Sequence, residues 1–410
     1  MRRMKDSGIA WIGEIPEEWE TKKARFLFQQ RLTKGSESGV LLASTQNYGI
    51  IPQYKIEGAV KVKEDTNLQL FKRVEKNDFV ISLRSFQGGI EHSEYDGVCS
   101  PAYQVFFNTT PLYHHFFKYL FKSHIFISIL NNLSLGIRDG KNIQYKDVEC
   151  LYLPFPPLPE QHRIAAYLDD KCAEIDRSME LARQGIDKLK AYRMSVITEA
   201  VTKGLDPDVP MKDGGVPWIG EIPEGWHVSS VRWEFDNLDG RRKPISAENR
   251  ISIHGSYDYY GASGVIDKID EFIFDEPLIL IGEDGANLAL RNLPLIYIAT
   301  GKYWVNNHAH ILKPKINNNL SYMAYQLECV DLFHFLTGST QPKLTQANLS
   351  KIPVACPPLS EQHRIAAYLD AKCAEIDAII AQKQELLDKL AAYRKSLIFE
   401  CVTGKREVAA

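Results

Sequence analysis

The sequence predicts an α+β protein in which two globular domains are joined by two long antiparallel coiled-coil helices, as a pseudo-twofold internal repeat. Three observations lead to this prediction. A long helical segment occurs twice, a short glycine- and proline-rich motif occurs twice, and the segments between them combine β-rich and helical runs. The expected segments are a lead-in motif with the first globular domain at 1–156, a central helix at 157–205, a second lead-in motif and globular domain at 206–357, and a C-terminal helix at 358–410.

The bulk composition fits a multi-domain protein without a membrane segment. The chain has 410 residues, of which 44% are hydrophobic, and no apolar run is long enough to span a bilayer. No signal peptide follows Met1, so we expect a cytoplasmic location. The seven cysteines form no CxxC pair, which indicates neither a disulfide framework nor a zinc site. A net charge of −3 disfavours indiscriminate binding of polyanions but is compatible with a local basic groove.

The lead-in motif occurs at 6–19 and again at 213–226. Both copies are rich in glycine and proline, and both carry two tryptophans eight positions apart. This composition predicts a fixed loop packed by aromatic side chains. Stacking of Trp11 and Trp218 on a ligand is the alternative, although no polar residues of the motif converge with them.

The two variable segments between lead-in and helix are each large enough for an independent domain, and their sequences are not recognisably alike. Each contains a short β-rich run and an aromatic run with helical character, which together predict a mixed α+β domain. The β-rich runs are 78–83 and 277–281, and the helical runs are 113–130 and 320–336.

A polar loop that contains glycine lies near the end of each variable segment, at 134–142 and 337–345. In both halves a helical run precedes the loop and a short hydrophobic strand follows it. Side chains of the types found in these loops contact phosphates and base edges in nucleic acids. A loop that merely joins a helix to a strand is the alternative. The candidate DNA-binding residues are Arg138, Lys141, Asn142, Ser339, Thr340, Gln341, Lys343 and Thr345.

The long helical segment runs from Glu160 to Arg193 and returns from Glu361 to Arg394. Each copy follows a proline-rich break and continues for roughly forty residues without a proline, which predicts a helix of about 60 Å. Its apolar residues recur in heptads, as in a coiled coil, and two such helices in one chain would most simply pack on each other. The predicted seam residues are Leu168, Ile175, Ile186, Leu189, Leu369, Ile376, Leu387 and Leu390.

The sequence lacks the motifs of an adenine methyltransferase and the P-loop of a motor. Glu283 and Asp284 could suggest a metal, but acidic residues in a glycine-flanked turn more often shape the turn. His308 and His310 are two positions apart and suggest a metal pair, yet no third ligand is identifiable. We therefore expect neither a catalytic residue nor a metal site.

The chain resembles the specificity subunit of type I restriction-modification systems over essentially its whole length. The resemblance rests on the doubled Pro-Pro-Leu-x-Glu-Gln-x-x-Ile-Ala helix openings at Pro156 and Pro357 and on the doubled Trp-Ile-Gly-Glu-Ile-Pro lead-ins. The loop 338–344 and the turn 281–286 add to it. The first half departs from this pattern, because 136–139 reads Gly-Ile-Arg-Asp in place of the Gly-Ser-x-Gln form.

The resemblance implies two target-recognition domains, each reading one half of a split, asymmetric site in double-stranded DNA. The long helices would act as a spacer and as the dock for two methyltransferase subunits, and restriction or motor subunits would complete the nuclease. No cofactor is expected on this chain, whereas S-adenosylmethionine, ATP and Mg²⁺ are expected on the partner subunits. A stand-alone DNA endonuclease with an unrecognised active site and a coiled-coil scaffold that does not bind DNA are the alternatives.

Overall fold

The computed structural model describes residues 2–35, 39–46, 48–56, 68–134, 143–251, 253, 255–285, 287–290, 294–338 and 342–409. The chain forms two compact units, of which the first combines Met1–Arg183 with Glu385–Ala410 and the second is Gln184–Gln384. Each long helix is divided between the units. Each compact unit therefore contains one globular domain together with one half of each long helix.

The first unit is built on an antiparallel sheet with the strand order β4-β11-β8-β9. Its β8 (Phe79–Ile81) is wholly buried, because Phe79 and Ile81 face the helices while Val80 faces a second apolar cluster. Helix α2 (His114–Lys122) buries one aromatic face in the same apolar cluster as Phe79 and Ile81 of the sheet. The other helices and strands of this globular part are β1 (Met4–Asp6), β2 (Glu14–Pro16), β3 (Glu20–Lys23), η1 (Ala24–Phe26), β4 (Phe28–Gln30), β5 (Leu42–Thr45), β6 (Gly49–Pro52), η2 (Gln53–Lys55), η3 (Leu68–Leu70), β7 (Lys72–Val74), α1 (Ser85–Gly88), β9 (Glu91–His92), β10 (Gly97–Cys99), β11 (Gln104–Asn108), α3 (His124–Ser134), α4 (Tyr145–Val148) and β12 (Tyr152–Phe155).

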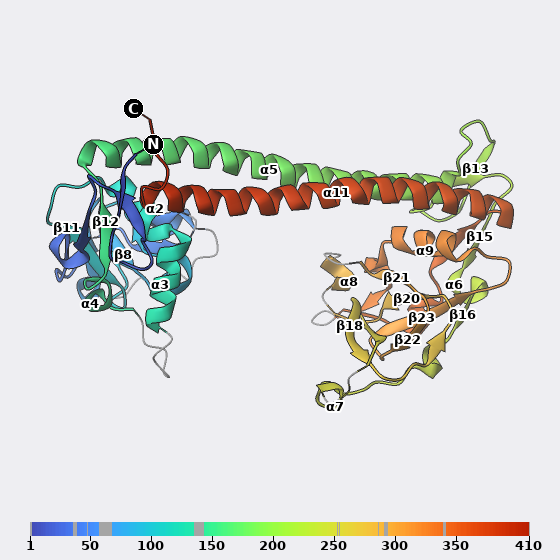
Figure 1. Cartoon of the computed structure of the whole chain (residues 1–410). Helices are drawn as coiled ribbons and strands as arrows, with labels where there is room; N and C mark the ends of the chain where they lie inside the picture. The colour runs from blue at the N-terminus through green and yellow to red at the C-terminus, as the bar shows by residue number, and fades with distance from the viewer. Residues whose placement is uncertain are drawn as a thin grey trace. The chain divides into compact units, whose positions relative to one another are not determined.

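The second unit contains an antiparallel sheet with the order β16-β23-β20-β21. One face of β20 (Leu278–Gly282) packs in the cluster that includes α9 (Leu320–Cys329), and the other packs against a second sheet, β18-β17-β22-β19 (Figure 1). The other helices and strands here are β13 (Met211–Asp213), β14 (Glu221–Pro223), β15 (His227–Ser230), α6 (Val231–Glu234), β16 (Phe235–Asn237), η4 (Asp239–Arg241), α7 (Ala247–Ile251), β17 (Tyr257–Gly261), β18 (Gly264–Ile269), β19 (Phe274–Asp275), α8 (Asn287–Leu290), β21 (Ile296–Ala299), β22 (Lys302–Val305), β23 (Ala309–Pro314), η5 (Leu332–Phe335), β24 (Leu336–Thr337), β25 (Lys343–Leu344), α10 (Gln346–Leu349) and β26 (Pro353–Cys356).

The two units share a topology that their variable sequences do not reveal. The strands β4, β11, β8 and β9 of the first sheet correspond in order to β16, β23, β20 and β21 of the second. Each unit also has a lead-in hairpin and a ladder that joins the lead-in to the strand before the long helix. The predicted α+β architecture with an internal repeat is therefore confirmed.

The predicted helical runs are shorter in the structure than in the sequence analysis. The first is divided into α2 and α3 at Ser123, whose hydroxyl donates to the Leu120 carbonyl at 2.7 Å. The second ends as α9 at Cys329, after which the Asp331 side chain accepts from the Phe333 N–H at 3.0 Å and starts η5. In both places a short polar side chain bonds nearby backbone and competes with continuation of the helix.

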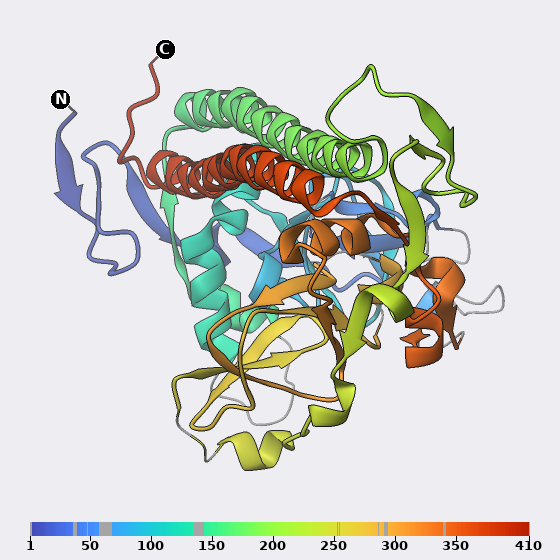
Figure 2. The same cartoon turned by 90° about the vertical axis from the view of Figure 1, so that its right-hand side faces the viewer.

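The long helices are α5 (Leu158–Lys203) and α11 (Leu359–Val402), and they lie side by side in both views (Figures 1 and 2). Within the first unit, Asp176 pairs with Arg394 at 3.0 Å, and Tyr167 accepts from Arg406 at 3.2 Å. Rising numbers along α5 thus meet falling numbers along α11, and the helices are antiparallel. Of the predicted seam residues, Leu189 and Leu390 are half-buried and the other six are buried. Among the described residues, no helix has the length and apolar character needed to cross a bilayer.

The doubled motifs meet where each long helix begins. In the first unit the indole N–H of Trp19 donates to Glu160 at 2.8 Å, and in the second Trp226 donates to Glu361 at 3.0 Å. Both indoles are buried, so each needs an internal acceptor. The glutamate in the first helical turn supplies this acceptor, which explains why the lead-in and the helix opening recur together.

The next residue of each helix opening fixes the following element in the same way. Gln161 accepts from the backbone N–H of Tyr113, and Gln362 accepts from that of Asn319, both at 2.8 Å. Each glutamine also donates to a carbonyl of the proline break, Pro156 or Pro357. The break, the helix opening and the start of α2 or α9 are therefore one hydrogen-bonded junction in each unit.

Candidate nucleic-acid interface

The polar loop of the second unit lies between the paired strands β24 and β25. Ser339, Thr340 and Gln341 of the predicted set lie outside the described residues. The following part is anchored to the turn after β20, because the N–H of Leu344 donates to the Glu283 carbonyl at 2.8 Å and that of Gly285 donates to the Pro342 carbonyl at 3.2 Å. The loop therefore leaves and re-enters the domain at a fixed place.

The two predicted loop residues that the structure describes have different surroundings. The Lys343 ammonium is half-exposed and lies 3.1 Å from Glu283, so it has an internal counter-charge and still faces solvent. The Thr345 hydroxyl instead accepts from the N–H of Asn348 at 3.3 Å and caps the N-terminus of α10. Thr345 therefore has a local structural role in addition to any contact with a ligand.

Behind the loop lies a buried ionic network centred on His310. Its Nδ1 lies 2.6 Å from Asp239, and its Nε2 lies 2.7 Å from the Leu344 carbonyl of the loop. A carbonyl oxygen can only accept, so the Nε2–H of His310 donates to Leu344, and the Asp239 carboxylate lies against the other ring nitrogen. The His310 side chain is completely buried, and it links strand β23 directly to the loop.

The acidic members of this network are held in their charged forms. Burial by itself would raise the pKa of Asp239, but hydrogen bonds and charge from His310, with bonds from the Ile311 N–H and Gln346, lower it to about 2. Burial opposes ionisation of Glu283 as well, and the hydrogen bonds from Arg242 and Lys343 lower its pKa below the ordinary range. The loop is thus bonded to buried side chains whose charges are paired with one another.

The network answers the questions that the sequence left open about these acidic and histidine residues. Glu283 forms ion pairs with Arg242 and Lys343, and Asp284 lies 2.8 Å from His308. The two acidic residues therefore bind side chains around the turn. His308 and His310 therefore have different partners. The sequence analysis did not identify Asp239 as part of this network, because it lies 71 positions from His310 and no motif marks it.

Asp239, Glu283 and His310 are close enough for their ligand atoms to hold a metal ion. Their atoms are already used, however. Both oxygens of Asp239 accept hydrogen bonds, Glu283 is paired with two cations, and His310 Nε2 points at a carbonyl. A ring nitrogen that donates a proton has no lone pair for a metal. The arrangement is that of a structural ion network.

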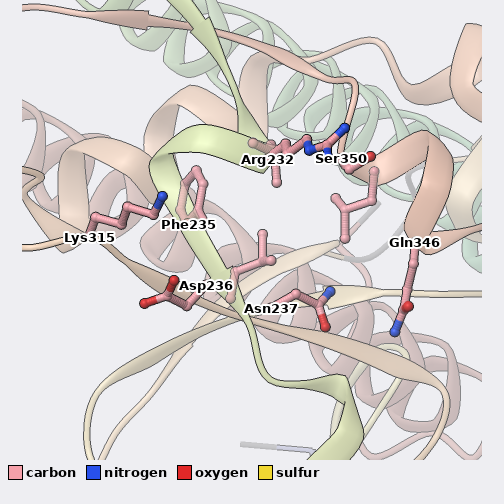
Figure 3. Close-up of a pocket in the computed structure, with 10 residues that line it drawn as sticks. Arg232, Phe235, Asp236, Asn237, Lys315, Gln346 and Ser350 are labelled. Carbon is pink, nitrogen blue, oxygen red and sulfur yellow. The ribbon is translucent and has the colours of Figure 1, made fainter.

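A cavity of about 290 Å³ lies beside this network in the second unit (Figure 3). Gln346 connects the two, because it lines the cavity and donates to Asp239 at 2.7 Å. The first unit has Tyr145 at the equivalent place in α4, and its hydroxyl donates to the Phe28 carbonyl at 2.6 Å. The cavity is lined by Val231, Arg232, Phe235, Asp236, Asn237, Leu312, Lys315, Gln346, Leu349 and Ser350.

In the first unit, the predicted residues Arg138, Lys141 and Asn142 lie outside the described residues. The described part of this unit has a different buried polar pair. Arg31 donates to both carboxylate oxygens of buried Asp78, at 2.7 and 2.9 Å. The two units therefore use the same sheet order with different charged interiors.

The chain matches the family described as "Type I restriction modification DNA specificity domain" over residues 16–190 and 223–389. It is 37% identical to a putative type I restriction enzyme specificity subunit of Haemophilus influenzae over 153 residues, which cover 36% of this chain and 38% of that protein. It is 22% identical to the putative type I restriction enzyme MjaX specificity subunit of Methanocaldococcus jannaschii, over 97% of this chain and 96% of that protein.

Two solved structures have a similar fold. One, from work on complex assembly and conformational transition of the type I R-M system, superposes with a TM-score of 0.70 at 15% identity, covering 96% of this chain and 99% of that one. The other is the HsdS subunit from Thermoanaerobacter tengcongensis, with a TM-score of 0.52 at 16% identity over 96% of this chain and 98% of that one.

Proposed function

The chain belongs to the family of type I restriction-modification DNA specificity domains, and from that membership we propose that the polar loop of its second unit contacts DNA directly. A member of this family recognises DNA for a type I restriction-modification complex and is not itself an enzyme. The observation that supports this DNA contact is that the loop is anchored by His310 and Glu283. A segment that carries base-reading side chains must hold them in place, and here the loop is tied to a buried charged network.

The side chains of this loop suit the two kinds of contact that a specific complex needs. Glutamine can pair bidentately with adenine, so we propose Gln341 as a base-reading residue. Lysine contacts phosphate as a point charge, and the half-exposed Lys343 can exchange part of its pairing with Glu283 for a phosphate. Base contacts would give specificity and the phosphate contact would give orientation.

The two units would read the two parts of a divided, asymmetric site in double-stranded DNA. Each unit has its own sheet, and the buried charged pairs of the two units differ: Arg31 with Asp78 in the first, Asp239 with His310 in the second. Different interiors would position different side chains. The helices α5 and α11 would then set the gap between the two parts.

The proposed partners are two methyltransferase subunits and the restriction or motor subunits. The duplicated junctions at Glu160 and Glu361 support a number of two, because each unit presents the same arrangement of lead-in and helix opening. S-adenosylmethionine, ATP and Mg²⁺ would be bound by these partners. The contribution of this chain would be recognition and spacing.

Two substitutions test the loop. If Gln341 reads a base, Gln341→Ala costs about 1–3 kcal/mol and relaxes one position of one half-site only. If Lys343 contacts phosphate, Lys343→Ala weakens binding to all sequences alike and reduces the salt slope by about one unit. Binding to a panel of single-base variants at two salt concentrations separates the effects. Lys302→Ala, an exposed lysine on β22, is the matched control.

Unchanged affinity and preference in both loop variants would assign the loop a connecting role. The other classes of function are tested with the purified chain, DNA, Mg²⁺ and ATP. A recognition subunit gives salt-dependent binding without cleavage, a stand-alone endonuclease gives cleavage, and a scaffold gives neither.

A further inference from the structure

Two solvent-exposed arginine–aromatic pairs lie at equivalent positions of the two units. In the first, the guanidinium carbon of Arg25 lies 5.0 Å from the centre of the Phe26 ring. In the second, that of Arg232 lies 5.2 Å from the Trp233 ring. Phe26 and Trp233 are each 62% exposed. Both pairs belong to the short helical turn between the lead-in ladder and the first strand of the sheet, η1 or α6.

The equivalence of the pairs is built into the backbone. The N–H of Arg25 donates to the Glu149 carbonyl and that of Arg232 to the Ser350 carbonyl, both at 3.0 Å. The preceding residue makes a matching bond in each unit, from Ala24 to Leu151 at 2.8 Å and from Val231 to Ile352 at 2.9 Å. Each turn is therefore clamped by the segment that precedes the long helix, and its side chains are presented from a fixed surface.

The packing of the units does not account for these side chains. A single exposed aromatic residue is ordinary on a protein surface. Here, however, the exposed ring recurs in both units beside an arginine, and neither guanidinium forms an ion pair within the described part of the chain. The neighbouring stack of Lys23 on Tyr152 has no such counterpart, because Ser230 and Pro353 occupy the equivalent pair of positions. Of these two neighbouring cation–aromatic stacks, the arginine–aromatic pair is therefore the one that recurs in both units.

We propose that each pair anchors one copy of a protein partner that offers an apolar groove beside acidic side chains. Arginine and tryptophan are enriched among residues that dominate protein interfaces, and burial of the ring would strengthen the ion pair formed by the neighbouring guanidinium. Duplex DNA is a poorer fit. The guanidinium could meet a phosphate, but the ring needs an unstacked base to stack upon.

Two equivalent anchors predict two copies of the partner per chain. The identification of this partner with the methyltransferase subunit rests on the proposed function. The surface differs from the polar loop, which is tied to Glu283 and His310 and is proposed to contact DNA. The two surfaces therefore have separable effects: one on assembly and the other on DNA recognition.

The test is to co-express the full chain with a type I methyltransferase subunit from the same source and to measure stoichiometry by native mass spectrometry and affinity by titration. The variants are Arg25→Glu with Phe26→Ala, Arg232→Glu with Trp233→Ala, and all four changes together. The controls are Tyr54→Ala in the first unit and Phe333→Ala in the second, which remove rings that are 78% and 70% exposed and stack on no arginine among the described residues. Trp233→Phe keeps a ring and should retain the partner.

We expect two copies on the wild-type chain and on the controls, one copy on either double variant with at least a tenfold loss of affinity for the other, and none on the quadruple variant. Binding of the isolated chain to DNA should stay at the wild-type level, which also shows that the variants are folded. Two copies with wild-type affinity on the quadruple variant would overturn the docking assignment alone. Weaker DNA binding by folded variants with unchanged assembly would assign the pairs to DNA. A wild-type chain that binds no methyltransferase subunit would overturn the proposed function and this assignment with it.

Discussion

Each unit buries a titratable side chain, and the two side chains are accommodated in different ways. Asp239 of the second unit is ionised and accepts hydrogen bonds at both oxygens, whereas His92 of the first is buried and neither ring nitrogen bonds to a described residue. Asp239 is bonded to His310, which in turn bonds to the Leu344 carbonyl of the polar loop. The His92 ring instead lies against the rings of Phe79, His114 and His115. These two residues therefore respond to pH and to substitution in different ways.

Asp239→Asn should destabilise the second unit at neutral pH. The side chain keeps its shape but loses the charge that faces the buried His310 ring. We expect a cost of about 3 kcal/mol, because one partner of a buried ion pair is removed. A carboxyl whose folded pKa is about 2 against an ordinary 3.8 contributes stability above 3.8 that is lost as pH falls toward 2. Urea unfolding between pH 7 and 2.5 should therefore show the two proteins converging in acid, and a constant difference would contradict the assignment.

His92→Phe should stabilise the first unit, and more at pH 5 than at pH 8. Burial, with repulsion from Lys118, His115 and His114, lowers the pKa of His92 to about 3 from 6.5. The unfolded chain therefore takes up a proton as pH falls below 6.5 while the folded chain does not, and wild-type stability declines. At pH 5 this amounts to about 2 kcal/mol. Hydrogen exchange of the β8 and β9 amides measures the gain.

Glu91, the neighbouring residue on β9, has the opposite slope and provides an internal check. Burial raises its pKa from 4.5 to about 7, despite the ion pair with Lys122 at 2.5 Å. Its contribution is present below 4.5 and is lost as pH rises through 7. In the His92→Phe variant this slope is no longer opposed, so stability should fall as pH rises from 5 to 7. An equal gain at pH 5 and pH 8 would mean that His92 is not neutral and buried as described.

At the scale of elements, the repeated lead-in motifs pack against the ends of the long helices. Gly404 follows α11 with φ +73° and Gly204 follows α5 with φ +77°. A Cβ on Gly404 would overlap the Pro16 ring and lie 3.2 Å from Trp19, and a Cβ on Gly204 would lie 3.3 Å from Trp226. In each unit, the end of one long helix and the beginning of the other thus meet at the same lead-in tryptophan.

Gly404→Ala should destabilise the first unit more than the left-handed backbone alone requires. Alanine in this conformation costs about 1 kcal/mol, and the overlap with a proline ring adds about 1–3 kcal/mol. Gly215→Ala is the matched control, because its φ is +69° and a Cβ there would have no neighbour within 4 Å. Thermal unfolding of the two variants gives the comparison. Equal losses would show that the end of α11 does not pack against the lead-in motif.

At the scale of the whole molecule, two units with the same strand order in their main sheets share two helices that continue from one unit into the other. The Arg193–Asp377 pair in the second unit is the counterpart of Arg394–Asp176 in the first, at 3.2 and 3.0 Å. Because the same contacts recur along the helix pair, removing one heptad from each helix should leave the remaining contacts in register. The recurring contacts also support one partner per repeat.

Removing one heptad from both helices should shorten the gap between the two parts of the recognised DNA site. Deleting 182–188 from α5 and 380–386 from α11 keeps the seam in register and shortens each helix by about 10 Å, or about three base pairs. Binding to sites with every gap length measures the change. The same deletion in α5 alone mismatches the pair and should abolish cooperation between the parts. A gap that stays fixed while both parts still bind would exclude a spacer role.

The sequence by itself determined the features that are periodic or repeated. The heptad seam, the doubled lead-in and the doubled helix openings follow from spacing, and the structure buries residues such as Leu168 and Leu369 and joins Trp19 to Glu160 and Trp226 to Glu361. Period and identity are visible within a short window, and one buried face of a helix fixes which positions must be apolar.

Only the tertiary structure decided the rest. The contact between Asp239 and His310 joins residues 71 positions apart through the pairing of β16 with β23, and no local pattern encodes that register. The common sheet order of two dissimilar segments was hidden for a related reason. Sheet pairing is made by backbone hydrogen bonds, which almost any side chains permit, so topology can be kept while the sequence changes. The division of each helix between two units depends likewise on contacts far apart in the chain.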